Sequence, residues 1–554
     1  MKFKRLFFFI LLFLILFSLP KNLFAQSSLR LSLPGWTHQE GSKEKAGIVL
    51  EGATDVQFSS VVVDNLDGDL SNGLETVVGS SNGIVFAYHS DGTLLWKVEL
   101  PNFNCSDAGS NNKLISSPAV GDLLGDGTKY VVIGYGGITT ACGGGVVAIK
   151  GDDGSLFWHF NLIRFGKRFG FSERLHSVVS IPALADTNQS GTLEIGFGAF
   201  DRNVYLLDAR GKAIWYYNAA DTVWSSPAFA DIGKPRGLEM IIGTDISQNK
   251  ALKPPTSNGG ILYAFKGATK YRRFGKKARK RSKTKHLFFR QRKAFKWKRA
   301  LNQVIFSSPV VADLFEQIPG KEIVVGSGCF FPQGSSNKRG KWIKIFRQRK
   351  GKLLKTISIP GCLESEIALG DIDEDGKLEI VLVSNEDPSV GGDGIATLVA
   401  YKRDGTLLWQ RDIQDVNGAN NSFGSRYQSP VVADVDGNGS LEVIVANGSS
   451  VNIYSGKDGS PLTCQGKCKN GLTAKLKTGG SLKSTPAVAD VNQDGKLDII
   501  IGGVLSDGRG ALYGWTGFDE AINSEPGTKT PYLAPWPMKR GNAKRTGVFN
   551  PTNL

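Results

Sequence analysis

The stretch from Tyr427 to Gly448 reads YQSPVVADVDGNGSLEVIVANG, and its pattern recurs along the chain. A short apolar run enters an acidic loop that contains glycine. The loop exits into a run rich in Val and Ile, a composition typical of β-strands. Successive copies are about 45–60 residues apart, which is typical of propeller blades or solenoid repeats. Eight copies can be recognised, and they begin near Phe58, Ile115, His176, Trp224, Phe306, Leu363, Tyr427 and Leu482.

Each copy continues into two further strand-like runs. A glycine-rich turn leads to a third apolar run, such as GIVFAYHS, and a turn such as SDG leads to a fourth run. Four antiparallel strands per repeat, rich in Val, Ile and aromatic residues, form the blade of a β-propeller. A strand sandwich is the alternative, but it does not predict a fixed repeat. The sequence therefore predicts an all-β β-propeller of seven or eight four-stranded blades, with eight preferred.

Several of the fourth runs end in Trp. A large ring at one position of each outer strand would pack between neighbouring blades and set their spacing, and we prefer this role to a ligand cage. The residues concerned are Trp96, Trp158, Trp215 and Trp409.

The N-terminus is typical of an export signal. Lys2, Lys4 and Arg5 precede an apolar run of roughly 14 residues, shorter than the roughly 20 that span a bilayer, and Ala25 fits a cleavage site. An uncleaved anchor is the alternative. We expect an exported protein (extracellular, at the cell surface or in the periplasm) with no transmembrane span after signal cleavage. The predicted organisation is a signal peptide at 1–25, an N-terminal segment that completes ring closure at 26–57, a propeller at 58–520 with a basic insertion at about 266–299, and a closing tail at 521–554.

The six Cys residues of an exported chain are expected to form disulfides. They fall into pairs that are local in sequence. The spacing of the last pair could also hold half of a metal site, but no matching Cys or His pair lies nearby. The predicted pairs are Cys105–Cys142, Cys329–Cys362 and Cys464–Cys468.

The acidic loops carry the residue types of a metal site. Residues 371–379 read DIDEDGKLE, in which carboxylates alternate, glycine permits a sharp turn and a final acid ends the loop. Alternate carboxylates in a tight loop converge on one point, and Ca²⁺ binds about six to eight oxygens of this kind. Without a cation such carboxylates repel one another. The predicted ligands here are Asp371, Asp373, Asp375 and Glu379.

Four other repeats carry related loops. The loop of the third repeat matches the acidic pattern less well than the loops of the seventh and eighth repeats. The loop of the first repeat matches only if a short insertion is allowed. The second repeat has Leu124 and Tyr130 where ligands belong, and we expect the loops of the fourth and fifth, which lack the middle acids, to be empty. The further predicted ligands are Asp434, Asp436, Asn438, Glu442, Asp490, Asn492, Asp494, Asp498, Asp186, Asn188, Ser190, Glu194, Asn65, Asp67, Asp69 and Glu75.

One isolated loop of Asp, Gly and Asn is an ordinary turn. The recurrence of one spacing at the same point of several repeats favours calcium as a structural cofactor that stabilises the native state. At these residues the chain, over about 50–520, resembles the FG-GAP/VCBS (integrin-α-like) repeat family. The resemblance implies a propeller, typically seven-bladed, with calcium in D-x-D-x-D-G-x-x-(D/E) loops, and it implies binding of a ligand, matrix or partner. The runs AYHSDGTLLW and AYKRDGTLLW also resemble quinoprotein (PQQ-type) repeats, and PWPMKRGNAKRTGVF resembles a terminal motif of secreted propellers.

The net charge of +16 is concentrated in one segment. Residues 266–299 contain 17 Lys or Arg and no acid, and without these 17 the chain has 50 basic against 51 acidic residues. A solvated loop without a partner is one interpretation. The other is a patch for a polyanion such as an acidic glycan, lipopolysaccharide, anionic membrane or nucleic acid.

Catalysis has little support in the sequence. None of the five His residues lies in a recognisable catalytic motif, and the acids cluster in the predicted metal loops. We therefore predict a calcium-binding propeller that acts as a binding, adhesion or scaffolding module, with a protein or glycan ligand at the cell surface. The alternatives are a periplasmic quinoprotein-like oxidoreductase, which needs a cofactor pocket on the propeller axis, and a purely structural envelope protein.

Overall fold

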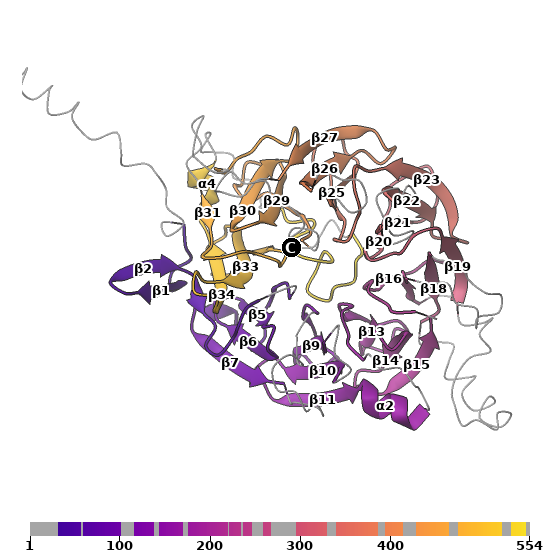
Figure 1. Ribbon diagram of the computed structural model, residues 1–554, viewed down its shortest axis with the longest axis horizontal. Helices are drawn as coiled ribbons and strands as arrows, with labels where there is room; N and C mark the ends of the chain where they lie inside the picture. Colours follow the sequence, from indigo (N-terminus) through magenta and orange to yellow (C-terminus); the bar gives the residue numbers. More distant parts are fainter. Residues whose placement is uncertain are drawn as a thin grey trace, which may run out of the picture.

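The computed structural model is an eight-bladed β-propeller, in which each blade is a four-stranded antiparallel sheet (Figure 1). This confirms the predicted fold class and the preference for eight blades. Among the described residues, no helix has both the length and the apolar character needed to cross a membrane. The structure describes residues 31–56, 59–100, 116–137, 143–169, 176–219, 221–233, 237–245, 259–267, 295–329, 340–385, 394–413, 428–464, 475–522 and 533–549.

The first four blades follow one another along the chain. Blade 1 contains β4 (Val62–Asp64), β5 (Glu75–Gly79), β6 (Ile84–Tyr88) and β7 (Leu94–Glu99). Blade 2 contains β8 (Ala119–Gly121), β9 (Tyr130–Tyr135), β10 (Gly145–Lys150) and β11 (Leu156–Asn161). Blade 3 contains β12 (Ala183–Ala185), β13 (Glu194–Gly198), β14 (Asn203–Leu207) and β15 (Ala213–Asn218). Blade 4 contains β16 (Ala228–Ala230), β17 (Glu239–Ile242), β18 (Gly260–Phe265) and β19 (Phe295–Leu301).

The remaining blades keep the same order. Blade 5 contains β20 (Val310–Ala312), β21 (Glu322–Gly326), β22 (Trp342–Arg347) and β23 (Lys352–Ser358). Blade 6 contains β24 (Ala368–Gly370), β25 (Glu379–Asn385), β26 (Ala396–Tyr401) and β27 (Leu407–Asp412). Blade 7 contains β28 (Val431–Ala433), β29 (Glu442–Asn447), β30 (Ser450–Ser455) and β31 (Leu476–Lys477). Blade 8 contains β32 (Ala487–Ala489), β33 (Asp498–Val504), β34 (Gly510–Trp515) and β3 (Ile48–Val49).

Blade 8 joins the two ends of the chain. Its outer strand β3 comes from the N-terminal region and pairs antiparallel with β34, with Ile48 opposite Leu512 and Val49 opposite Ala511. The hairpin of β1 (Thr37–Glu40) and β2 (Lys43–Ala46) projects beside this blade (Figure 1). The described helices are short: η1 (Leu70–Asn72), α2 (Leu162–Phe169) and α4 (Phe518–Ala521).

Hydrogen bonds also join neighbouring blades where their first strands begin. The backbone N–H of Ser60 donates to Ser117 Oγ of blade 2, and the N–H of Thr485 in blade 8 donates to Ser60 Oγ, both at 2.9 Å. Blades 3 and 4, 4 and 5, 6 and 7, and 7 and 8 share this contact. Between blades 5 and 6, Glu366 accepts from Ser308 instead. Polar residues before most of the first strands therefore join neighbouring blades.

The outer-strand Trp residues dock on the next blade, as the sequence predicts. Trp96 Nε1 donates to the carbonyl of Gly151 at 2.6 Å. A Cβ on Gly154, in the same turn, would lie 2.9 Å from the Trp96 ring, so the turn requires glycine there. Trp36 makes the corresponding contact from the N-terminal region to the carbonyl of Ser90 in blade 1. The four predicted residues pack between blades: Trp96, Trp158, Trp215 and Trp409.

Residues 533–549, which we call the axial segment, lie inside the ring (Figure 1). Its backbone hydrogen-bonds to the first strands of blades 2, 3, 4, 5, 7 and 8. Arg545 reaches blade 1 by donating to the carbonyls of Ser60 and Val61, and Arg540 reaches blade 6 through Glu366. The axial segment therefore contacts all eight blades.

One predicted disulfide lies wholly within the described residues. Cys329, after β21, bonds to Cys362, which precedes β24, so the bond joins blade 5 to blade 6 with a Cα–Cα distance of 5.5 Å. This confirms the Cys329–Cys362 pair. Cys464 is also disulfide-bonded, but Cys468 and the Cys105–Cys142 pair lie outside the described residues.

Replacing both Cys329 and Cys362 with Ala should lower the free energy of unfolding by about 2–4 kcal/mol, because the unfolded chain would lose a cross-link. Chemical denaturation of the oxidised protein and of the double variant measures the difference. The variant is more specific than a reductant, which would also break the bond at Cys464. Equal denaturation midpoints would show that this bond adds nothing to stability.

Candidate metal-binding loops

The acidic loops connect the first and second strands of the blades, so the ring brings them all to one face of the propeller. The last acid of each loop begins the second strand. One of its carboxylate oxygens accepts a backbone N–H from the loop at 2.7–3.1 Å in seven blades. This bond positions the carboxylate whether or not a metal is bound. The residues concerned are Glu75, Glu194, Glu239, Glu322, Glu379, Glu442 and Asp498.

Blade 7 holds the most deeply buried acidic cluster among the described residues. Oxygens of Asp434, Asp436 and Glu442 lie within 4.8 Å of one another, and all three side chains are buried. Burial raises the pKa of Asp436 to about 6. Burial and the charge of Asp436 raise the pKa of Glu442 well above its ordinary value. Asn438 also faces the cluster, with its Nδ2 donating to Asp436 Oδ2 at 3.0 Å. Three buried carboxylates therefore lie so close that their negative charges repel one another when no cation is bound.

Blade 6 forms a similar cluster but also supplies a cation of its own. Oxygens of Asp371, Asp373 and Glu379 lie within 4.8 Å of one another, and burial raises the pKa of Glu379 to about 8. Lys402, directly after β26, places its Nζ 2.5 Å from Asp373 Oδ2 and 3.1 Å from Asp375 Oδ2. Asp375 is exposed and lies outside the cluster. The ammonium of Lys402 therefore offsets part of the charge that a metal would neutralise.

The loop of blade 8 is more open. Burial raises the pKa of Asp498 to about 7, but the described side chains of this loop do not form a cluster within 4.8 Å. Asn492 Nδ2 donates to Asp494 Oδ2 at 3.1 Å, and the Gly495 N–H donates to Asp490 Oδ2 at 3.0 Å. A cation in this loop would contact all three acids only if the Asp494 side chain moved closer to Asp490 and Asp498.

In the loop of blade 3, donors from the loop itself form hydrogen bonds with the carboxylates. Glu194 accepts from the Thr187 hydroxyl at 2.6 Å and from Asn188 Nδ2 at 2.5 Å, one bond to each of its oxygens. Asp186 accepts the backbone N–H groups of Ser190 and Gly191 at 2.9 and 2.8 Å. Because these carboxylates are already hydrogen-bonded, a bound cation would stabilise this loop less than the loops of blades 6 and 7.

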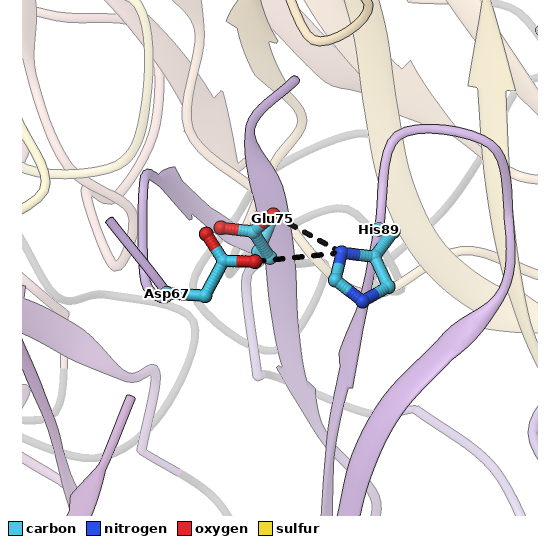
Figure 2. Close-up of side chains that lie close together, drawn as sticks. All are labelled: Asp67, Glu75 and His89. Carbon is cyan, nitrogen blue, oxygen red and sulfur yellow. Dashed lines mark hydrogen bonds and ion pairs between the residues drawn. The ribbon is translucent and has the colours of Figure 1, made fainter. Parts of the chain in front are cut away.

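Blade 1 assembles a different set from the predicted one (Figure 2). Asp67 and Glu75 come together with His89, which directly follows β6 and was not among the predicted ligands. Asp69 instead is exposed and caps η1, where its Oδ1 accepts from the Ser71 N–H at 2.9 Å. Asn65 Oδ1 accepts from the Gly68 N–H at 2.7 Å, a bond that closes the loop.

In the remaining blades other groups engage the acids. In blade 4, Lys296 Nζ lies 2.5 Å from Glu239 Oε1. In blade 2, Asp122 accepts the backbone N–H groups of Gly125 and Gly127 at 2.7 and 2.8 Å. In these two blades a lysine or backbone N–H groups contact the acids of the repeat, and the described carboxylates do not gather into a cluster.

The donor sets of blades 6, 7 and 8 fit a hard cation such as Ca²⁺, which prefers carboxylate and amide oxygens. Buried carboxylate oxygens of Asp371, Asp373, Asp490 and Asp498 have no hydrogen-bond partner in the described structure. A buried unpaired carboxylate oxygen is costly unless a cation binds it. Asp371 and Asp490 both have pKa values raised mainly by burial.

The propeller axis, where a quinoprotein would need its cofactor pocket, is occupied at the level of the first strands. The axial segment lies there, and the side chains of Arg540 and Arg545 are fully buried in it. The structure therefore gives the quinoprotein alternative no support at this position.

Blades 4 and 5 carry an exposed basic set on their outer strands and on one turn. Its four side chains are exposed: Lys298 on β19, Arg349 and Lys350 in the turn after β22, and Lys352 on β23. We call this set the cationic face. Trp297 Nε1 donates to the Gln348 carbonyl at 2.8 Å, which holds β19 against that turn. Residues 268–294, which make up most of the predicted basic insertion, lie outside the described residues.

Comparison with known proteins matches two families to parts of the chain. Residues 434–501 match the family described as FG-GAP-like repeat, which confirms the resemblance seen in the sequence. Residues 362–458 match the family described as Rhamnogalacturonan lyase family 11, C-terminal domain. The rhamnogalacturonan endolyase YesW of Bacillus subtilis (strain 168) is 32% identical over 98 residues, which span 17% of this chain and 15% of the lyase.

Two solved structures are similar at low identity. BamB from Moraxella catarrhalis is 14% identical with a TM-score of 0.45, over 87% of this chain and 100% of that one. The quinohemoprotein alcohol dehydrogenase ADHIIG from Pseudomonas putida HK5 is 11% identical with a TM-score of 0.43, over 87% and 79% of the two chains. At these scores neither protein indicates what this chain does.

Proposed function

We propose that this protein is an exported, calcium-stabilised β-propeller that binds an acidic polysaccharide through its cationic face. It would act as a surface-recognition module, with the calcium loops on one face of the ring maintaining the shape of the blades. The observation that carries the proposal is the set of four exposed basic side chains on blades 4 and 5, and the sequence between β18 and β19 is also rich in Lys and Arg.

The charges of the cationic face are available to a ligand. None of its four side chains forms an ion pair with a carboxylate within the part of the chain that the structure describes. Elsewhere on blades 4 and 5, Glu239 pairs with Lys296 and Glu316 lies 3.9 Å from Arg403. Clustered cations without counter-charges attract a polyanion by long-range electrostatics.

The comparisons favour a polysaccharide over other polyanions. The family matched by residues 362–458 and the endolyase YesW both carry rhamnogalacturonan in their names, and galacturonan chains are anionic. The lyase activity of that relative stays outside the proposal, because the match spans only 15% of the lyase. Export is consistent with the disulfide between blades 5 and 6, since disulfides persist in oxidising compartments.

The test is binding to immobilised polygalacturonate by a variant in which Lys298, Arg349, Lys350 and Lys352 are all replaced with Gln. Each exposed cation contributes about 0.3–1 kcal/mol, so four together should account for a loss of affinity of about tenfold or more. The dependence of affinity on salt concentration should also weaken.

A matched control removes four exposed charges elsewhere, at Lys43, Lys45, Lys97 and Lys544. This control should bind like the unmodified protein. Equal losses in both variants would mean that overall charge alone drives binding. If double-stranded DNA competes as well as polygalacturonate per unit of charge, the polysaccharide assignment is wrong even though the cationic face binds.

A further inference from the structure

The cluster in blade 1 differs in chemistry from those in blades 6 and 7 because it contains an imidazole (Figure 2). His89 Nδ1 lies 3.3 Å from Glu75 Oε1 and 4.0 Å from Asp67 Oδ2. The three side chains come from the acidic loop, the start of β5 and the end of β6, so the sheet itself brings them together. Glu75 is fully buried, while Asp67 and His89 are only partly covered.

The spacing of these atoms fits a transition-metal ion. Ligands at 2.0–2.2 Å around a tetrahedral ion are about 3.4 Å from one another. The 3.3 Å between His89 and Glu75 matches this spacing, and the 4.0 Å between His89 and Asp67 would have to shorten when a metal binds. Imidazole nitrogen together with carboxylate oxygen is a donor set used for zinc and related ions, whereas calcium sites consist of oxygens. Because the side chains of Asp67 and His89 are partly exposed, water can reach the cluster as a further ligand.

Hydrogen bonds hold both carboxylates of this cluster in position. Asn72, in η1, donates its Nδ2 to Asp67 Oδ2 at 2.8 Å, and its own Oδ1 is buried without a hydrogen-bond partner. The backbone N–H of Leu66 binds the other Glu75 oxygen at 2.7 Å, so Glu75 Oε1 remains directed at His89. Both carboxylates are therefore fixed beside His89 before any metal binds.

We propose that blade 1 holds one transition-metal ion of the zinc type, with His89 Nδ1, Glu75 Oε1 and Asp67 Oδ2 as protein ligands. The site is distinct from the calcium loops and does not depend on polysaccharide binding. With this site, one face of the propeller carries two classes of metal site. The residue that follows the third strand of a blade determines which class that blade holds.

The competing explanation is that His89 acts only as an internal cation. Lys402 takes the equivalent position in blade 6 and contacts Asp373 and Asp375 there. A protonated His89 could pair with Glu75 in the same way and exclude any metal. The two explanations predict opposite results when metal is added.

Co²⁺ titration in the presence of excess Ca²⁺ tests the proposal, because calcium fills the oxygen-only loops and Co²⁺ reports nitrogen ligation by visible absorption. We expect the full chain to bind one equivalent of Co²⁺ that Zn²⁺ displaces. His89→Ala should weaken this binding at least about tenfold, since even outer-shell partners of metal sites cause losses of that size. His38→Ala, on the β1–β2 hairpin, is the matched control and should leave it unchanged.

His89→Lys separates metal binding from folding. It imitates the arrangement of blade 6, so we expect it to melt like the metal-free unmodified protein and to bind no Co²⁺. Absence of Co²⁺ binding to the unmodified chain, or unchanged binding in His89→Ala, would overturn the proposal. Both outcomes are independent of polygalacturonate retention, which tests the cationic face.

Discussion

Replacing Arg545 with Met is expected to lower the free energy of unfolding by at least about 3 kcal/mol, a large part of the total stability of a typical protein. The guanidinium is fully buried on the axis, where it donates to the carbonyls of Pro118, Lys539 and Val61 at 2.5–2.9 Å. Met fills a similar volume but donates nothing, so these buried carbonyls would lose their partner at about 1 kcal/mol or more each.

The neighbouring Lys544 provides the control for this prediction. It lies in the same segment and carries the same charge, but its side chain is exposed, so Lys544→Met should change stability by less than about 0.5 kcal/mol. Chemical denaturation of both variants measures the contrast. Similar midpoints for Arg545→Met and the unmodified protein would mean that the axial segment does not hold the ring together.

The repeat and its blade order were predictable because they depend on local patterns. Strand runs and turns recur in every copy and Trp recurs in several, so periodicity favoured eight blades over seven. The role of Arg540 and Arg545 was not predictable in this way. Both are charged residues in a glycine-containing tail, and only the closed ring shows that they are buried among backbone carbonyls of distant blades.

The acidic loops were partly predictable for the same reason. Spacing within one loop placed Asp434, Asp436 and Glu442 together, and it anticipated the cluster of Asp371, Asp373 and Glu379. It did not reveal His89 or Lys402, because these approach the loops from a different strand. The signal that could have found them is their shared position, directly after the third apolar run in GIVFAYHS and ATLVAYKR.

Removing calcium should lower the free energy of unfolding. The effect of Glu442→Gln on that free energy should be destabilising with calcium bound and neutral or stabilising without it. In saturating calcium, at about 100 times the dissociation constant, one site adds about 2.7 kcal/mol to stability, and the variant should lose roughly this amount. In a chelator at pH 8 the variant should equal or exceed the unmodified protein. There it removes a buried carboxylate whose pKa is raised by burial and by the charge of Asp436.

The pH dependence follows from the direction of these shifts. A carboxyl with a raised pKa in the folded state retains its proton at a pH where the unfolded chain has released it, so stability falls as pH rises between the two values. Asp436 at about 6, Asp498 at about 7 and Glu379 at about 8 place that fall between about pH 4 and pH 8. Chelated protein should therefore melt lower at pH 8 than at pH 5, and the gain from added calcium should grow over the same range.

Thermal melting of the unmodified protein and Glu442→Gln, with calcium and with chelator at pH 5 and pH 8, measures all of these differences together. Glu99→Gln, an exposed change on β7, is the control and should track the unmodified protein in every condition. A bound cation cancels the repulsion that makes Glu442 costly, so its carboxylate stabilises the loaded protein and destabilises the empty one. If Glu442→Gln shifts melting equally with calcium and with chelator, blade 7 binds no cation and the raised pKa values reflect burial alone.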